Sequence, residues 1–238
     1  KGYLIGGIIG SLVISVLILL LQNFGDLFAV YALIFMTVLM VFGTMFYASW
    51  ILPLFNKLTP LPEGELRHSI EEYCRENHFQ LDNLFVMDGS KRSTKANAFF
   101  SGLGHKKNIV LYDNLINSMT TEEITAVLAH EVGHYKKKHI LKSMVLSVLQ
   151  TGILFFLFGQ LASHPVMAEV LGAKQNSFHL SLITFTLLYA PVSFVTGLLM
   201  NIFSRKNEYE ADAFAAKTYT AAYLISALKK LSVNHLSN

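Results

Sequence analysis

Residues 121–163 read TEEITAVLAHEVGHYKKKHILKSMVLSVLQTGILFFLFGQLAS, and their pattern indicates the fold class of the chain. The first half of this stretch mixes acidic, basic and histidine side chains, whereas residues 143–163 carry no charged side chain. A helix needs about 20 apolar residues to cross the ~30 Å hydrocarbon core of a membrane. The stretch therefore predicts a polar helix that is followed directly by a membrane-spanning one.

Further uncharged runs of this kind surround the stretch. They cover residues 2–23, 27–56 and 175–204, and the last is interrupted only by His179 near its start. Of the 238 residues, 53% are hydrophobic and only 15% are charged, which is too apolar for an average soluble domain. We therefore expect a mainly α, polytopic membrane protein with four spans. A soluble protein with four buried helices of this length is the alternative, and it fits so short a chain poorly.

Lysine and arginine at the span ends predict the orientation of the chain. One side of the third and fourth spans carries Lys136, Lys137, Lys138, Lys142, Arg205 and Lys206, and the turn at residues 22–26 has neither lysine nor arginine. Such an excess of positive charge marks the cytoplasmic side of a membrane protein. The polar residues 57–142 and the tail after Arg205 are then cytosolic, with residues 164–174 on the opposite side.

Charge and cysteine content limit the chemistry of the chain. The net charge of +3 comes from 19 Lys and Arg against 16 Asp and Glu without a long block of one sign, so nothing indicates a nucleic-acid partner. Cys74 is the only cysteine, which excludes an intramolecular disulfide and a cysteine-based zinc site. A metal would need histidine and carboxylate ligands.

The polar region between the second and third spans predicts a small α+β domain. A helix is expected within residues 60–77, opening after the sequence Pro-Glu-Gly. Short β-branched and aromatic runs predict strands at residues 84–87, 97–100 and 108–112. A second helix is expected to begin at Thr121, with Thr120 or Thr121 itself as its cap.

The second helix of this region carries a His-Glu-x-x-His motif. His130 and His134 are four residues apart, so both imidazoles lie on one helix face and can bind one Zn²⁺ at ~2.0–2.1 Å. Glu131 lies beside them and can take a proton from an attacking water. The alternative is a chance occurrence of the motif on an ordinary amphipathic helix, which a third ligand in a suitable place would disfavour.

The nearest histidine after the motif is a poor third ligand. His139 follows His134 by five residues, whereas the long form of the zinc motif requires six and has a glycine where Lys137 stands. We therefore expect His139 to be a polar residue at the membrane boundary.

The segment after the fourth span, SRKNEYEADAFA at residues 204–215, offers a better third ligand. Glu208 and Asp212 are four apart and share a helix face, so one can bind zinc while the other accepts the free N–H of a ligating imidazole. Glu210 points elsewhere and is expected to be solvated. The third and fourth spans form a hairpin, which returns this segment to the level of the motif helix.

The pairing of HEVGH at residues 130–134 with NEYEAD at residues 207–212 resembles the gluzincin pattern. The surrounding spans resemble those of the Ste24-type CAAX prenyl proteases of the M48 class. Further specific matches are PLFNKLTPLPEG at residues 53–64, MDGSKRS at residues 87–93 and IVLYD at residues 109–113. The resemblance covers essentially the whole chain. It implies an α-helical membrane chamber with a small zincin-like domain on its cytosolic side.

The resemblance also implies roles for particular residues. One Zn²⁺ per chain would be held by His130, His134 and Glu208, with Glu131 as the general base and Asp212 as an orienting carboxylate. Asn97 and Ala98 match the edge strand that holds the substrate backbone in such enzymes, so strand addition is the expected binding mode. The membrane would be the inner membrane of a bacterium or the endoplasmic reticulum of a eukaryote, with the active site facing the cytosol.

Four segments make up the expected domain organisation. They are a two-span hairpin in residues 1–56, the zincin-like domain in 57–142, a second two-span hairpin in 143–204 and a helical segment with the third ligand in 205–238. The chain is interpreted as the core of a longer protein, because such enzymes have two more spans before it and supply a histidine and an arginine from a segment after it. His235 does not match that segment, and Lys95 stands where the family has a histidine.

We therefore expect a membrane-embedded zinc metalloendopeptidase that acts on C-terminal, prenylated peptides or on membrane proteins, with the lipid bilayer as its other partner. One alternative is an HtpX-like quality-control protease, which shares the zinc motifs but not the DGSKRS run at residues 88–93. A non-catalytic scaffold with a structural zinc is disfavoured by Glu131, since such a site needs four closed ligands and no base. A transporter is disfavoured because the ionisable residues cluster at the span ends.

Overall fold

The computed structural model describes residues 2–91, 97–101, 108–162, 164, 166–173 and 177–236. Lys95 lies outside these ranges, and the side chain of His235 is not described either. The chain divides into two compact units, one made of residues 1–40 and 141–204 and the other of residues 41–140 and 205–238.

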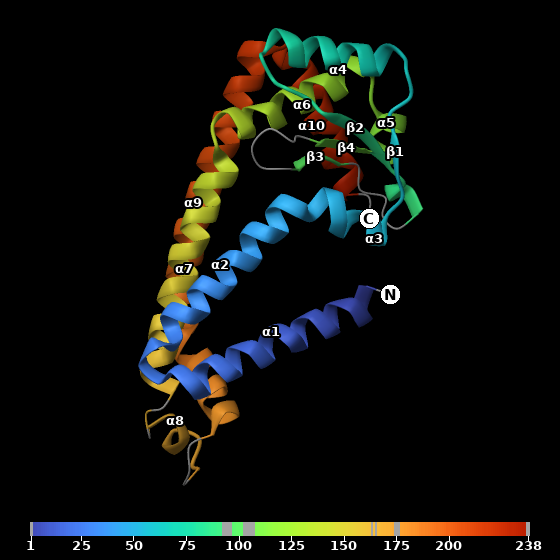
Figure 1. Cartoon of the computed structure of the whole chain (residues 1–238). Coiled ribbons are helices and arrows are strands. Elements are labelled where there is room, and N and C mark those ends of the chain that lie inside the picture. Colours follow the sequence, from blue (N-terminus) through green and yellow to red (C-terminus); the bar gives the residue numbers. More distant parts are fainter. Residues whose placement is uncertain are drawn as a thin grey trace. The chain divides into compact units, whose positions relative to one another are not determined.

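The first unit consists of apolar helices (Figure 1). Its elements are α1 (Gly2–Phe24), the 3₁₀ turn η1 (Gly25–Leu27), most of α2 (Phe28–Phe46), most of α7 (His139–Ala162), α8 (Val166–Glu169) and α9 (Phe178–Thr218) as far as residue 204. The segments long and apolar enough to cross a membrane are Tyr3–Phe46, which contains both α1 and α2, His139–Ala162 and His179–Thr218. The expectation of a mainly α, polytopic membrane protein is confirmed, with the first two predicted spans joined in one segment.

Aromatic side chains pack α2, α7 and α9 together in this unit. The ring of Phe28 meets those of Phe155 and Phe158 edge-on at centroid distances of 5.8 and 5.9 Å. Phe158 in turn meets Phe185 of α9 at 5.1 Å. Many other apolar side chains of the unit point outward, such as Leu12, which is 61% exposed. Apolar surface of this kind suits contact with lipid better than contact with water.

The second unit is built around a four-stranded sheet. Its strands are β1 (Leu58–Pro60), β2 (Asn83–Met87), β3 (Ala98–Ser101) and β4 (Asn108–Tyr112), in the order β1-β2-β4-β3. The central strands β2 and β4 are parallel, and each outer strand is antiparallel to its neighbour. The strands expected from the sequence are present. The sequence does not predict β1, because a three-residue strand that ends in proline lacks the alternating pattern of a longer one.

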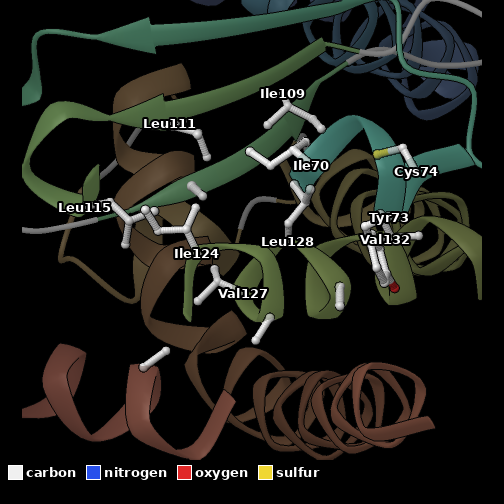
Figure 2. Packing of buried hydrophobic residues seen from close by; sticks show 14 of the residues in the cluster. Ile70, Tyr73, Cys74, Ile109, Leu111, Leu115, Ile124, Val127, Leu128 and Val132 are labelled. Carbon is white, nitrogen blue, oxygen red and sulfur yellow. The ribbon is translucent and has the colours of Figure 1, made fainter. Parts of the chain in front are cut away.

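The same unit also contains helices and helical turns. They are the end of α2, the π-helical turn η2 (Tyr47–Ile51), α3 (Leu52–Phe55), α4 (Glu65–Glu76), η3 (Gly89–Lys91), α5 (Asp113–Ser118), α6 (Thr121–Lys136), the end of α9 and α10 (Ala221–Leu236). Figure 2 shows the main core, in which Ile109 and Leu111 of β4 pack with Ile70 of α4 and Leu128 of α6. Val110 points to the opposite face and joins a smaller cluster, as the alternation of a strand requires.

The helix that carries the motif begins with a capping box. The Thr120 hydroxyl accepts a hydrogen bond from the Glu123 backbone N–H at 3.4 Å, and the Glu123 carboxylate accepts one from the Thr120 N–H at 3.0 Å. The same carboxylate accepts from Ser226 and Lys230 of α10, both at 2.6 Å. Glu123 therefore fixes the start of α6 against α10.

Candidate metal centre

Two helices of the second unit meet at Gly133 of α6. A Cβ atom placed on Gly133 would lie 3.1 Å from both the Cα atom and the carbonyl oxygen of Ala211 in α9. The lack of a side chain thus lets the two helix backbones approach closely. Ala211 is fully buried in this contact, which brings its neighbours Glu208 and Asp212 to the histidines of α6.

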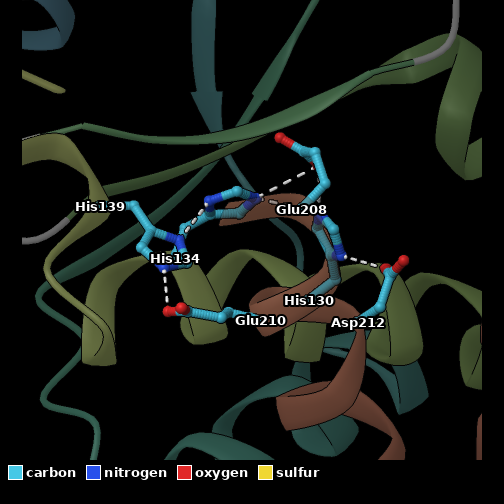
Figure 3. Close-up of polar contacts among 6 residues, drawn as sticks. All are labelled: His130, His134, His139, Glu208, Glu210 and Asp212. Carbon is cyan, nitrogen blue, oxygen red and sulfur yellow. Dashed lines mark hydrogen bonds and ion pairs between the residues drawn. The ribbon is translucent and has the colours of Figure 1, made fainter. Parts of the chain in front are cut away.

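Figure 3 shows the side chains that gather at this crossing. The Nε2 atoms of His130 and His134 lie 3.1 Å apart. The Oε2 atom of Glu208 lies 3.3 Å from the first and 3.6 Å from the second. These three side chains form a group that could hold a metal ion. The three residues expected to be ligands are therefore brought together, from two helices far apart in the chain.

Asp212 lies behind His130. The Nδ1–H of His130 donates to the Oδ1 atom of Asp212 at 2.8 Å. With this proton on Nδ1, the neutral imidazole keeps a lone pair on Nε2, on the side of Glu208. The sequence leaves open which of the two carboxylates lies closer to the metal, and Glu208 is the one that approaches both Nε2 atoms.

His139 and Glu210 also belong to this cluster. His139 is the first residue of the apolar segment His139–Ala162, as expected of a boundary residue, but it is buried, and Glu210 is only partly exposed and contacts it. The Nδ1 atom of His139 lies 2.9 Å from Nδ1 of His134, and its Nε2 atom lies 3.1 Å from Oε2 of Glu210. His139 is only 3% exposed. His139 lies against His134 because the helix breaks between α6 and α7, where Lys138 adopts a left-handed conformation with φ of +58° and redirects the chain.

The donor set fits a zinc ion. Ligand atoms ~2.0–2.1 Å from one Zn²⁺ in a tetrahedron lie about 3.3 Å apart, which is close to the spacing of 3.1, 3.3 and 3.6 Å found here. Two imidazole nitrogens and one carboxylate oxygen are a known ligand set of catalytic zinc, which keeps a further position for water or substrate. Burial, aided by the neighbouring His130, lowers the pKa of His134 and favours the neutral imidazole that a metal requires.

Glu131 lines a small pocket beside these donors. The pocket has a volume of about 150 Å³, and its walls include Asn97, Ala98, Glu131 and three leucines of α10, Leu224, Leu228 and Leu231. Burial raises the pKa of Glu131 to about 7, and the Glu208 carboxylate adds to this effect. A carboxylate with this pKa can accept a proton near neutral pH and release it again.

Asn97 and Ala98 lie at the start of β3, an outer strand of the sheet. Ala98 pairs with Leu111 of β4, and the carbonyl of Asn97 accepts a hydrogen bond from the Tyr112 N–H at 3.0 Å. Among the described residues β3 has β4 as its strand neighbour on one side only. The other edge of β3 therefore offers backbone N–H and C=O groups close to the pocket that Glu131 lines.

Comparisons with known proteins cover both units. A family model described as peptidase family M48 matches residues 60–237, and one described as CAAX prenyl protease N-terminal, five membrane helices, matches residues 1–57. CAAX prenyl protease 1 of Saccharomyces cerevisiae is 36% identical over 96% of this chain, and its homologue in Oryza sativa subsp. japonica is 38% identical over 100%. The crystal structure of S. mikatae Ste24p matches 99% of the chain with a TM-score of 0.91 and 35% identity. The chain spans 54%, 56% and 58% of the length of these three proteins, little more than half of each.

Proposed function

We infer the function of this chain from its family, because the chain belongs to peptidase family M48 and its residues 1–57 match part of the N-terminal region of the CAAX prenyl proteases. It is an integral membrane protein. We propose that the protein is a zinc metalloendopeptidase of the Ste24 type, which cleaves near the C-terminus of prenylated proteins. The observation that carries this proposal is the cluster of His130, His134 and Glu208 next to the half-buried carboxylate of Glu131.

Each residue of the cluster has its own role in the proposed hydrolysis. His130, His134 and Glu208 would hold one Zn²⁺ per chain, and Asp212 would orient His130 through its Nδ1–H. A Zn²⁺ ion bound there would polarise the scissile carbonyl and activate a water molecule as the nucleophile. Glu131 takes the proton from the attacking water and passes it to the leaving amine. No covalent bond between protein and substrate is needed.

The strand edge and the pocket beside Glu131 support binding of an extended peptide. A substrate strand added to the outer edge of β3 would be held by backbone hydrogen bonds near Asn97 and Ala98. The pocket of about 150 Å³ would then receive a side chain next to the scissile bond. The leucines of its α10 wall favour an aliphatic side chain, because burying an unpaired charge against them is costly.

We also propose that the metal centre faces the cytosol. The lysines at residues 136–138 precede α7, and Arg205 with Lys206 follows the apolar part of α9. These charges favour the cytosolic side for both segments. In a eukaryotic cell the membrane would be that of the endoplasmic reticulum, and in a bacterium the inner membrane.

The test is a peptidase assay on the full-length protein in detergent. One C-terminal peptide is supplied in farnesylated and unfarnesylated forms, with and without a zinc chelator that is later reversed by added Zn²⁺. We expect cleavage of the farnesylated peptide that the chelator abolishes and zinc restores. Equal cleavage of both peptides would contradict the prenyl preference but not the peptidase, whereas cleavage that persists in chelator with zinc fully removed would contradict the metal mechanism.

A further inference from the structure

The two imidazoles of the donor set are supported from behind by different partners. The Nδ1 atom of His130 meets a carboxylate directly, at 2.8 Å from Asp212. The Nδ1 atom of His134 instead meets a second histidine, His139, at 2.9 Å, and Nε2 of that histidine meets Glu210 at 3.1 Å. Each imidazole is thus backed by a carboxylate, one directly and the other through a histidine (Figure 3).

One arrangement of protons satisfies the contacts behind His134 when both imidazoles are neutral. A carboxylate only accepts, so His139 carries its proton on Nε2 and donates it to Glu210. The Nδ1 atom of His139 then has a lone pair and accepts from the Nδ1–H of His134. This leaves the lone pair of His134 on Nε2, the atom that faces His130 and Glu208.

We propose that His139 and Glu210 are positioning residues for the metal centre, which act through His134 by fixing the tautomer and ring direction that place its Nε2 lone pair at the metal. The inference rests on the proposed function, since it takes His130, His134 and Glu208 to be metal ligands. Outer partners of metal-bound histidines typically change metal affinity by about 10–100-fold when they are removed. We call the chain from His134 through His139 to Glu210 the histidine relay.

Burial and charge make the histidine relay specific. His139 is only 3% exposed, so water does not readily replace its partners. Glu210 is 32% exposed and uses Oε2 for His139, while its Oε1 atom lies 4.0 Å from the ammonium group of Lys206. The two oxygens of the carboxylate therefore face different partners, and the contact with His139 is the buried one.

Two other roles for His139 compete with the histidine relay: a further metal ligand and a purely structural link. It is not a further metal ligand in this geometry, because both of its ring nitrogens already have partners in His134 and Glu210. A purely structural link between the start of α7 and α9 is the competing explanation. Such a link needs only volume and contact, whereas the histidine relay needs an acceptor for His134 and a donor for Glu210 in the same side chain.

Two pairs of variants separate these explanations. His139→Phe keeps a ring and removes both polar atoms, whereas His139→Gln keeps an acceptor oxygen and a donor N–H. Glu210→Leu removes the acceptor for His139, whereas Glu210→Gln keeps one. His68→Phe, at an exposed histidine of α4, controls for the loss of a histidine elsewhere in the same unit.

The measurement is the Zn²⁺ affinity of the metal-depleted, full-length protein, obtained by competition with a chromogenic chelator. The visible absorption of the Co²⁺-loaded protein is recorded as well, because it reports the geometry of the ligands. We expect His139→Phe and Glu210→Leu to weaken Zn²⁺ binding by about 10–100-fold and to change the Co²⁺ spectrum. The two glutamine variants should bind much closer to the parent, and His68→Phe should match it.

Parental Zn²⁺ affinity in both His139→Phe and Glu210→Leu would overturn the inference. Equal weakening by phenylalanine and glutamine at residue 139 would overturn it too, because that is the pattern of a structural link. If His139→Phe does not fold, the pair at the partly exposed Glu210 decides by the same comparison. Glu208→Ala tests the proposed metal site separately from the histidine relay. If Glu208→Ala retains zinc, the proposed metal site is wrong. If Glu208→Ala loses zinc while the variants at His139 and Glu210 keep the parental affinity, only the histidine relay is overturned.

Discussion

Glu131 is the residue at which the proposed metal binding and the proposed catalysis can be separated. It lines the pocket beside the donors but is not one of the grouped donors itself. Glu131→Gln keeps the size of the side chain and removes the base. We therefore expect unchanged zinc content by elemental analysis and a fall in kcat of about 10²–10⁴-fold in the farnesylated-peptide assay, the usual contribution of a positioned general base.

Glu122→Gln is a matched control on the same helix. Glu122 lies in the first turn of α6, outside the pocket, so its substitution should leave both zinc content and kcat at the parental level. A Glu131→Gln protein that hydrolysed peptide at the parental rate would remove Glu131 from this role. Loss of zinc in the same variant would instead make Glu131 a ligand.

The limits of sequence-based prediction are visible at single residues of the site. His130 and His134 could be predicted from spacing, because residues four apart on one helix share a face, and Glu131 could be predicted from its place next to His130 in the motif. His139 could not, because its position depends on the left-handed turn at Lys138. A glycine there would have indicated such a turn, whereas a lysine with positive φ leaves no signal in the sequence.

At the scale of elements, the contact between α6 and α9 controls the distance between the donors. In Gly133→Ala the new Cβ would lie 3.1 Å from backbone atoms of Ala211, which cannot move away as a flexible side chain can. We expect the two helices to separate and Zn²⁺ affinity to fall by at least about 10-fold, comparable to the loss of an outer partner. The measurement is the chelator competition used for the histidine relay.

Gly152→Ala is the matched control for this substitution. Gly152 lies inside the apolar helix α7, and its new Cβ would meet only the flexible end of Leu33, at 3.4 Å. Alanine is a better helix former than glycine by about 1 kcal/mol, so propensity alone favours both variants. Gly133→Ala with parental zinc affinity would show that the close approach does not determine the ligand geometry.

The contact of Glu123 in α6 with Ser226 and Lys230 in α10 leads to a prediction about how stability depends on pH. Burial alone would raise the pKa of Glu123, but hydrogen bonds from Lys230, Ser226 and Thr120 outweigh it and lower the pKa below the ordinary value of 4.5. A group whose pKa is lowered on folding stabilises the folded state above its unfolded pKa, and this stabilisation is lost as pH falls through the folded pKa. The Glu123 contribution should thus be complete at neutral pH and decline below about pH 4.5.

Glu123→Gln tests this linkage. Because charge-assisted hydrogen bonds contribute about 1.5–3 kcal/mol each, we expect the substitution to lower the thermal unfolding temperature clearly at pH 7. The difference from the parent should shrink as the pH is lowered below 4.5, where the parent loses the same interaction. A difference that stayed constant from pH 7 to pH 3 would contradict the assignment. Adding Lys230→Met to Glu123→Gln should lower the unfolding temperature little further, because the two side chains stabilise the fold through the same contact.

The existence of an element was predictable where one pattern dominated, although α9 continues to Thr218, beyond the apolar residues 175–204. The apolar runs predict α1, α2, α7 and α9, because uncharged runs of this length are typical of membrane-spanning helices. The burial of β4 on both faces explains why it reads as the continuous apolar run IVL. β1 leaves no such signal, because its pairing with β2 depends on tertiary contact and not on its own three residues.

At the scale of the whole molecule, the candidate site draws on four separated segments. They are the start of β3, the second half of α6 with the start of α7, residues 208–212 of α9, and α10. The donors of α6 and α9 are separated in the chain by the apolar segments of α7 and α9. An even number of membrane crossings between them is required, since an odd number would place His134 and Glu208 on opposite sides of the membrane.

This requirement leads to a prediction about topology that single cysteines can test. Cys74 is the only cysteine in these 238 residues and is 2% exposed, so this part of the protein should give little background with a membrane-impermeant maleimide. Lys137→Cys and Asp26→Cys each place one thiol at an exposed residue, the first next to the motif helix and the second in the turn between α1 and α2. In sealed vesicles with the cytosolic face outward, Lys137→Cys should be labelled and Asp26→Cys should not, because positive charge favours the cytosolic side. Detergent should make both thiols reactive, and the reverse pattern before detergent would place the metal centre on the non-cytosolic side.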